Sequence, residues 1–300
     1  MKNIGMIGTQ IIHTYPYLAY FNGFDPERVQ KNAKPWMAKM LEGKPNDPKS
    51  NAVRITHVWA GEADEAKRLA ESCAIENIAD KPDAFVDDVD GVMVMDEEID
   101  QRAGLMRPFL EAGKAVFVDK TLSLDPSVTE ELLSLSKERG APIAAYSQLR
   151  FGPGFEDLKA MDRGGAAMAG FRMGLDILAK YSIHLISAVQ GIFGTGVKTL
   201  RKLDCPDGVE VRASYGDGTR VTMQFGPEAP AGWNICYFAK GGCTLAVAGD
   251  NADMFETSAQ AIEKMLVEGR SPVSTKEISE ASKLINFIVE AEVGDEKTIG

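Results

Sequence analysis

Apolar runs and segments of helical period alternate along the first half of the chain. Short runs rich in β-branched residues predict buried strands, the first of which contains Ile4, Met6 and Ile7, and the others cover residues 54–59, 90–95, 114–120 and 141–148. Segments with helical spacing of apolar positions lie between them, at residues 62–75, 100–113 and 124–140. This alternation is typical of parallel strands joined by crossover helices, so we predict a doubly wound α/β domain.

Two segments of this half carry further signals. Residues 124–140 have Asp125 as an N-cap, a proline in the first turn, acidic residues early, basic residues late and Gly140 at the end, which together favour a helix. Residues 22–52, between the first helix and the second strand, are long and turn-rich and contain Pro26, Pro35, Pro45 and Pro48. We interpret them as an inserted lobe or flap.

Beyond residue 200 the pattern changes to hairpins. Residues 209–225 alternate between apolar and polar on both sides of Gly216-Asp217-Gly218, and residues 232–249 repeat the pattern around Gly241-Gly242. Helical segments at 254–269 and 275–292 close the chain. Since 300 residues also exceed the usual size of one domain, we predict two: residues 1–122 with the parallel sheet, and residues 123–300, an α+β domain on a mainly antiparallel sheet, whose last helix crosses back.

The composition is that of a soluble globular protein. The chain has 44% hydrophobic and 26% charged residues, and no apolar stretch approaches the roughly 18 residues that cross a bilayer. The N-terminus enters a strand without a basic segment, an apolar region and a cleavage site, so we expect a cytoplasmic protein. The four cysteines form no C-x-x-C pair and suit a reducing compartment, and we assign them no metal site and no chemistry.

The charge narrows the class of partner. A formal net charge of −11 without a cluster of basic residues argues against nucleic acid and other polyanions. We therefore expect a small-molecule ligand, with neither nucleic acid nor membrane as a partner. An open apolar sheet face in the second domain would associate with another copy, so we also expect a homodimer or homotetramer.

The first turn resembles a dinucleotide-binding loop that has lost glycines. Gly8 lies where a buried strand turns sharply into a helix, but the fingerprint next needs glycine at position 10 and glycine or alanine at position 13. Gln10 and His13 occupy these places. The helix N-terminus still offers N–H groups to an anion. Two interpretations stay open: a cofactor loop with altered glycines, or a nucleotide fold that binds no nucleotide.

A family resemblance rests on several stretches in a fixed order. After the strand-turn-helix come "DGVMVM" at residues 90–95, "EAGKAVFVDKT" at 111–121, "YSQLRFGPGFEDLK" at 146–159, "YSIHLISAVQGIFG" at 181–194 and "MLVEGRSPVSTKE" at 265–277. Over nearly the whole chain this resembles the glucose-fructose oxidoreductase, inositol dehydrogenase and rhizopine-catabolism (Gfo/Idh/MocA) family. The resemblance implies a Rossmann-type first domain and an NAD(P)-dependent oxidoreductase that acts on a sugar, a polyol or a related alcohol.

Two catalytic residues follow from the resemblance. The family's Glu-Lys-Pro turn corresponds to Asp119-Lys120-Thr121. Lys120 would hydrogen-bond the substrate oxygen that gains or loses a proton and would contact the nicotinamide ribose; the alternative is a solvated lysine at a strand end. His184 corresponds to the family's histidine and would be the general acid/base. The alternative for His184 is a hydrogen-bonded core residue on an apolar helix.

The largest departure from the family pattern lies one helical turn before this histidine. Lys180 stands where the family has aspartate, and Ser187 replaces a second acidic residue. If Asp176, Lys180 and His184 share one helix, their spacing of four places them on one face. Lys180 would then join Lys120 and His184 as a catalytic candidate, act as a proton acceptor and favour an anionic substrate. An equal alternative is a surface pair between Lys180 and Asp176.

Two further residues are candidates for substrate contact. Arg150, in the "QLRF" stretch at residues 148–151, has a rigid donor fork that can shape a substrate pocket, although a structural ion pair is equally plausible. Tyr181, next to Lys180, is the second candidate.

The candidate cofactor-binding residues lie at the ends of the predicted strands and are Gly8, Thr9, Gln10, Ile11, Glu62, Asp96 and Lys120. The resemblance places an acidic residue for the adenosine ribose at the end of the second strand, where Ala60 stands and Glu62 is near. The choice between NAD and NADP therefore stays open, with NAD favoured. The run from Asp96 to Glu98 adds negative charge near a pyrophosphate, which is unfavourable unless these carboxylates face water.

Three functions follow from these residues. The leading hypothesis is an NAD(P)-dependent oxidoreductase with an atypical, anionic hydroxy substrate. The alternative is a redox-inactive member of the family that serves as a ligand-binding or structural protein, which Gln10, the acidic run and Lys180 would explain. A third is non-redox lyase or isomerase chemistry by Lys120, Lys180 and His184.

Overall fold

The computed structural model describes residues 1–9, 11–229, 232–248 and 252–299. The chain divides into two compact units. The first comprises Met1–Ser123, Ser127–Ala145 and Phe255–Ser274, and the second comprises Leu124–Pro126, Tyr146–Met254 and Thr275–Gly300. Residues 127–145 and 255–274, which the sequence analysis assigned to the second domain, thus lie in the first unit.

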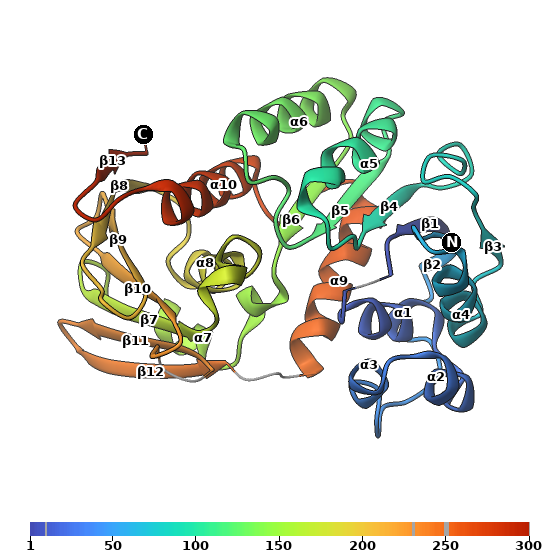
Figure 1. Ribbon diagram of the computed structural model, residues 1–300, viewed down its shortest axis with the longest axis horizontal. Helices are drawn as coiled ribbons and strands as arrows, with labels where there is room; N and C mark the ends of the chain where they lie inside the picture. Colours follow the sequence, from blue (N-terminus) through green and yellow to red (C-terminus); the bar gives the residue numbers. More distant parts are fainter. Residues whose placement is uncertain (10, 230–231, 249–251, 300) are drawn as a thin grey trace. The chain divides into compact units, whose positions relative to one another are not determined.

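The first unit is built on a six-stranded sheet in the order β3-β2-β1-β4-β5-β6 (Figure 1). Its strands are β1 (Lys2–Ile7), β2 (Val53–Trp59), β3 (Asn77–Ile78), β4 (Gly91–Val94), β5 (Ala115–Asp119) and β6 (Ile143–Tyr146). Neighbouring strands from β3 to β5 are parallel, which confirms the predicted doubly wound sheet. The strand order reverses between β1 and β4, and ligands of such sheets bind at the carboxyl side of this switch point.

Helices connect these strands as the periodicity predicts. They are α1 (Thr14–Asn22), α4 (Ala63–Cys73), α5 (Ile99–Glu111) and α6 (Pro126–Arg139). The predicted insertion contains α2 (Pro26–Asn32), capped by Asp25, and α3 (Pro35–Lys39). Most of α9 (Ala252–Glu268) belongs to this unit, where Ser258 Oγ lies 2.8 Å from Tyr17 OH.

The second unit has a seven-stranded sheet in the order β12-β11-β7-β10-β9-β8-β13. The strands are β7 (Ala166–Arg172), β8 (Val197–Leu203), β9 (Val209–Tyr215), β10 (Arg220–Gly226), β11 (Trp233–Ala239), β12 (Gly242–Ala248) and β13 (Glu296–Thr298). β7 and β10 are parallel, and the other described pairs are antiparallel. The mainly antiparallel sheet and both hairpins are therefore confirmed.

One face of this sheet is buried and the other is open. Alternation in the β9–β10 hairpin buries Val211, Ala213, Val221, Met223 and Phe225, which pack with α8 (Leu178–Phe193) and α10 (Thr275–Glu290). The last helix, α10, belongs to this unit, so the helix that returns to the first unit is α9 and not the last one. The short elements η1 (Gln148–Phe151), α7 (Phe155–Lys159) and η2 (Leu175–Ile177) complete the unit.

Candidate functional site

The turn after β1 is shaped by the approach of β4. Gly8 has φ +84°, and a Cβ at this position would lie 2.7 Å from the backbone N of Asp96. A side chain would therefore clash with backbone that cannot move aside, which explains this glycine. Thr9 Oγ1 donates a hydrogen bond to Glu65 Oε2 of α4 at 3.0 Å, and Ile11 is fully buried. The candidate Gln10 lies outside the described residues.

His13, at the position where the fingerprint needs a third small residue, reaches a different strand. It is the N-cap residue of α1 but caps no backbone N–H with its side chain. Its Nδ1 lies 2.8 Å from Asp119 Oδ2 at the end of β5, and both side chains are buried. The ring also contacts Phe255 of α9, with centroids 4.9 Å apart. A carboxylate only accepts hydrogen bonds, so His13 Nδ1 carries the proton and donates it.

Asp119 is held as a carboxylate inside the unit. Burial by itself raises the pKa of this group, but the charge and hydrogen bond of His13, together with the charges of Lys120 and Arg102, outweigh burial and lower the pKa below its ordinary value. The end of β5 therefore carries a fixed negative charge next to Lys120.

Lys120 follows β5 directly and has an unusual backbone. Its φ is +79°, a left-handed conformation that, among the described residues other than glycine, only Ala74 shares. The residue is 5% exposed. Lys120 is therefore a buried residue in a strained turn at the carboxyl edge of the sheet, and not the solvated lysine of the alternative interpretation.

Arg102 of α5 joins two strand ends around this turn. Its Nε and Nη2 donate to the Asp96 carbonyl oxygen at 2.9 and 2.6 Å, and its Nη1 donates to the Thr121 carbonyl oxygen at 2.6 Å. Arg102 was not among the candidates that the sequence indicated. An arginine with helical spacing on an otherwise apolar helix face is a weak signal of such a role.

Several buried polar atoms around the turn have no hydrogen-bond partner among the described residues. They are Asp119 Oδ1, Thr121 Oγ1 and Thr14 Oγ1. Buried polar atoms are normally paired, so orphaned ones at a strand edge fit a polar ligand. Asp96, expected near the pyrophosphate, is buried and accepts from the Glu98 N–H at 2.8 Å, and Glu62, expected near the adenosine ribose, is an exposed residue before α4. Asp96 thus does not face water.

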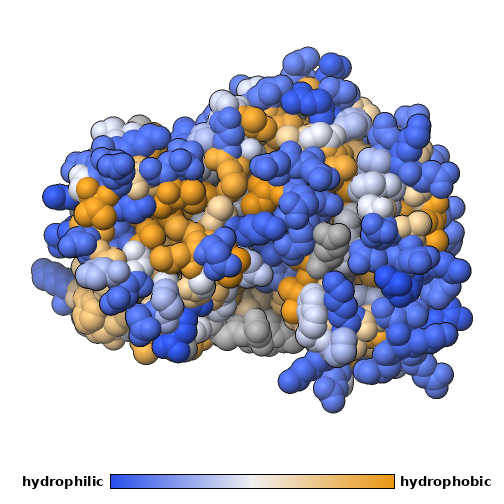
Figure 2. Space-filling model, viewed as in Figure 1, coloured by the Kyte–Doolittle hydropathy of each residue, from blue (hydrophilic) through white to orange (hydrophobic). Residues whose placement is uncertain are grey.

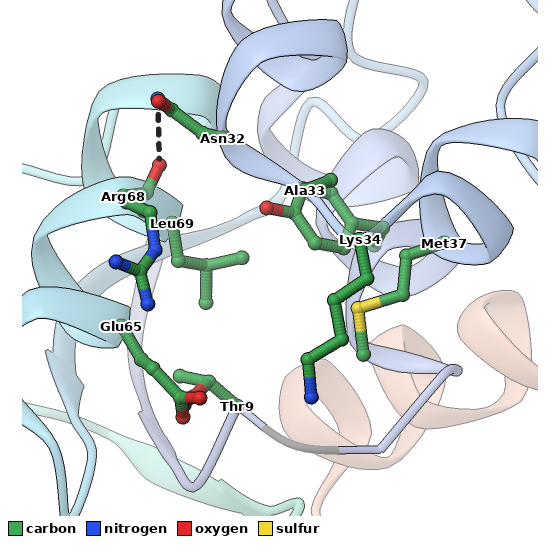
Figure 3. Close-up of a pocket in the computed structure, with 9 residues that line it drawn as sticks. Thr9, Asn32, Ala33, Lys34, Met37, Glu65, Arg68 and Leu69 are labelled. Atoms are coloured by element: carbon green, nitrogen blue, oxygen red, sulfur yellow. Dashed lines mark hydrogen bonds between the residues drawn. The ribbon is translucent and has the colours of Figure 1, made fainter.

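A pocket opens beside Thr9 (Figure 3). Lys34, between α2 and α3, extends toward Thr9 from one side, and Glu65 and Arg68 of α4 stand on the other. The remaining lining residues are Tyr15, Asn32, Ala33, Met37 and Leu69. Glu65, rather than Glu62, is the acidic residue that contacts the loop after β1. The contact depends on the packing of α4 against that loop, so sequence spacing alone did not indicate it.

The second unit positions His184 on α8. His184 is 4% exposed, and its Nδ1 lies 2.6 Å from Ser147 Oγ. Ser147 also accepts from the Leu149 N–H at the start of η1 and donates its own N–H to Ser187 Oγ at 3.0 Å. The His184 ring contacts the rings of Tyr181 and Trp233, with centroids 5.4 and 5.1 Å away. Ser147, which the sequence analysis did not single out, therefore orients this histidine.

The other candidates of this unit are distributed over three elements. Lys180 and Tyr181, both half-buried, lie on α8 with His184, but the exposed Asp176 belongs to η2, so the three predicted positions do not share one helix. Arg150 Nη2 forms an ion pair with Glu277 Oε1 of α10 at 3.1 Å. The structural ion pair that the sequence left open for Arg150 is thus present.

The matching family model describes an oxidoreductase family with an NAD-binding Rossmann fold, and it covers residues 2–147. Residues 2–147 of this chain therefore match the Gfo/Idh/MocA oxidoreductase family. The family resemblance seen in the sequence is therefore confirmed. Among curated proteins, none matches this chain.

Solved structures with the same fold extend over both units. A scyllo-inositol dehydrogenase from Lactobacillus casei has a TM-score of 0.75 at 13% identity, covering 99% of this chain and 98% of its own. An oxidoreductase from Agrobacterium radiobacter, in complex with NAD⁺, L-tartaric acid and magnesium, has a TM-score of 0.73 at 13% identity, covering 100% and 98%. A biliverdin reductase from Synechocystis, with biliverdin and NADP⁺, has a TM-score of 0.65 at 13% identity, covering 96% and 98%. At such identities the likeness establishes the fold alone.

Two other structural features are absent from the described residues. These residues contain no helix with the length and apolar character that a bilayer crossing requires. In the same residues, no group of three or more histidine, cysteine, aspartate or glutamate side chains is arranged to hold a metal ion.

Proposed function

We propose that the protein is an NAD(P)-dependent oxidoreductase that transfers hydride between the nicotinamide and a sugar, a polyol or a related hydroxy compound. The observation that carries this proposal is the buried, left-handed Lys120 at the carboxyl end of β5. Lys120 follows β5, within the segment that matches the NAD-binding family. β5 is the neighbour of β4, and the switch point at which such sheets bind ligands lies between β1 and β4.

The residues of the first unit fit a dinucleotide. Gly8 and Thr9 would receive the pyrophosphate at the turn after β1, and the orphaned hydroxyl of Thr121 with the Lys120 ammonium would contact the nicotinamide ribose. The pocket beside Thr9 offers both the cations of Lys34 and Arg68 and the carboxylate of Glu65. A carboxylate suits the adenosine ribose hydroxyls of NAD, whereas cations suit the 2′-phosphate of NADP. Binding measurements therefore decide between NAD and NADP.

When bound, the nicotinamide accepts or donates the hydride. Lys120 would donate a hydrogen bond to the substrate oxygen and stabilise the negative charge that develops there. His184, held at Nδ1 by Ser147, would take the hydroxyl proton during oxidation and return it during reduction. Lys180 and Tyr181, half-buried on the same helix, are proposed to contact the substrate, and the Lys180 ammonium would favour an anionic one.

Titration with NAD⁺, NADH and NADP⁺ in a thermal-shift assay tests the proposal, because a ligand that binds the folded state raises the melting temperature. We expect one nicotinamide cofactor to raise the melting temperature. We also expect turnover, measured by nicotinamide absorbance, with at least one compound from a panel of inositols, sugars and L-tartrate. A preference for anionic substrates that Lys180→Gln removes would support the role of Lys180. No shift with any of the three cofactors at millimolar concentration contradicts the proposal and leaves the redox-inactive alternative.

A further inference from the structure

Residues distant in the sequence hold the turn at Lys120 by contacts with the residues before and after this lysine. A residue other than glycine stays in the left-handed region only when its surroundings over-determine it. Lys120 has φ +79°, and Asp119, Lys120 and Thr121 are all buried, with exposures of 0%, 5% and 3%. The contacts that fix this turn should therefore be found on its neighbours in the chain.

The first contact holds the residue before the lysine. Asp119 Oδ2 accepts from His13 Nδ1 at 2.8 Å, across 106 positions of the sequence. In the sheet order, β1, which leads into His13, is separated from β5 by β4. His13 thus spans the end of β4 to reach the turn after β5, and the Phe255 ring packs against its imidazole. Replacing His13 by the glycine of the usual fingerprint would remove this connection.

The second contact holds the residue after the lysine. Arg102 Nη1 donates to the Thr121 carbonyl oxygen at 2.6 Å, while Nε and Nη2 of the same guanidinium donate to the Asp96 carbonyl oxygen. The planar donor fork of arginine allows one side chain to fix both backbone segments in one geometry. Asp96 lies at the end of β4 and next to Gly8, so the turn is tied to the loop after β1 through this arginine as well.

We propose that His13 and Arg102 are positioning residues that hold the 119–121 turn and thereby fix the Lys120 ammonium at the carboxyl edge of the sheet. The consequence for catalysis rests on the proposed oxidoreductase function, because a fixed cation stabilises developing charge without reorganisation. The placement of Lys120 itself does not depend on that function. His13, which stands where the glycine fingerprint needs a small residue, thus has a role of its own, because it holds the turn that carries Lys120.

Two substitutions at position 13 separate the hydrogen bond from the bulk of the side chain. The amide of His13→Asn can donate to Asp119 from nearly the same place as Nδ1, whereas His13→Leu keeps an apolar side chain without a donor. Tyr17→Phe is the matched control, because it removes another buried hydrogen bond of this unit, that of Tyr17 OH with Ser258 Oγ at 2.8 Å, and keeps the ring. Arg102→Lys tests the second contact, since one ammonium cannot reproduce the fork.

The first readout is the rate at which an amine-reactive reagent labels Lys120 in the folded protein, and it needs no cofactor. Peptide mass spectrometry measures this rate relative to that of Lys114, which directly precedes β5. We expect labelling to rise about tenfold in His13→Leu and Arg102→Lys, because loss of the local contact opens the turn. His13→Asn should stay within about threefold of the native rate, as should Tyr17→Phe.

The second readout is turnover. We expect kcat to fall about tenfold or more in His13→Leu with KM nearly unchanged, and to be largely restored in His13→Asn. Labelling in His13→Leu and Arg102→Lys that equals Tyr17→Phe would overturn the positioning proposal; if His13→Leu does not fold, Arg102→Lys decides alone. Absence of cofactor binding and turnover in the native protein would refute the oxidoreductase function instead, and the labelling comparison would still decide the placement of Lys120.

Discussion

At the scale of single residues, Lys120 joins a strained backbone to a buried cationic side chain. A left-handed conformation is strained for lysine and for alanine alike but not for glycine. We therefore expect Lys120→Gly to be more stable than Lys120→Ala by about 1 kcal/mol, in spite of the greater flexibility of glycine in the unfolded chain. Urea unfolding of both variants measures this difference.

Turnover should respond differently from stability. Both Lys120 variants lack the ammonium, so kcat should fall in both by about a hundredfold, whichever of the two is more stable. Equal stability of the two variants would contradict the strain at this position, and native turnover in either would contradict the catalytic role of Lys120.

Asp119 predicts a pH dependence of stability. Its pKa in the folded protein lies below the ordinary value of 3.8, so the unfolded state binds more protons in the interval between the two values, and stability rises with pH there. The contribution is complete above about pH 4 and is lost as the pH falls through the folded pKa. Asp119→Asn should therefore be less stable than the native protein at pH 7, by about 1–3 kcal/mol, and the gap should narrow below pH 4.

Urea unfolding at pH 7, 4 and 3 checks this expectation. The same loss at each pH would mean that the carboxylate charge contributes nothing and that only the shape of the side chain matters.

At the scale of secondary-structure elements, Ser147 connects the start of η1 to α8. Its hydroxyl lies 2.6 Å from His184 Nδ1, and its N–H donates to Ser187 Oγ, so one residue orients the imidazole and joins the two elements. We expect Ser147→Ala to lower stability by about 1 kcal/mol and kcat by about tenfold, because the ring is no longer held in one orientation.

Ser136→Ala provides the matched control for Ser147. Ser136 is also buried, and its hydroxyl donates to the Ala141 carbonyl oxygen at 2.6 Å in the first unit, a hydrogen bond that involves no candidate residue. This variant should lose similar stability and keep native kcat. A similar kcat in the two variants would show that Ser147 has only a structural role.

At the scale of the whole molecule, one face of the second sheet exposes large apolar side chains. Met168, Phe238, Leu245 and Val247 on this sheet are 46%, 52%, 60% and 54% exposed, and a shallow apolar pocket between them includes Cys236. In Figure 2 apolar residues also reach the surface over the second unit, on the left of the view. Such a patch on a monomer is unusual, so a homo-oligomer through this face stays our prediction.

Sedimentation at micromolar concentration tests this prediction. We expect a dimer or tetramer for the native chain and a shift toward monomer in Leu245→Asp, which places a charge at the centre of the apolar strand pair β11–β12. Lys240→Asp, in the turn that joins these strands, is the control for added negative charge and should keep the native state. A native monomer would contradict the prediction.

Local pattern determined most of the architecture. The apolar runs at residues 54–59, 90–95 and 114–120 predicted three strands that the structure has as β2, β4 and β5. Alternation on both sides of Gly216-Asp217-Gly218 predicted a half-buried antiparallel hairpin, in which the structure pairs Val221 with Ala213. The family motifs also led to Lys120 and His184. The strand and hairpin predictions succeed because burial of one face and the hydrogen-bond demands of the backbone act over a few residues, which a sequence displays directly.

Tertiary structure decided what these residues contact. The sequence showed His13 only as a missing glycine and assigned the returning helix to the end of the chain. It also gave no sign of Glu65, which contacts Thr9. The left-handed Lys120, its neighbours His13 and Arg102, and the Ser147–His184 hydrogen bond depend on groups far apart in sequence, 106 positions for His13 and Asp119. No periodicity encodes such pairs, because a hydrogen bond between distant residues forms only after packing has brought their strands and helices together.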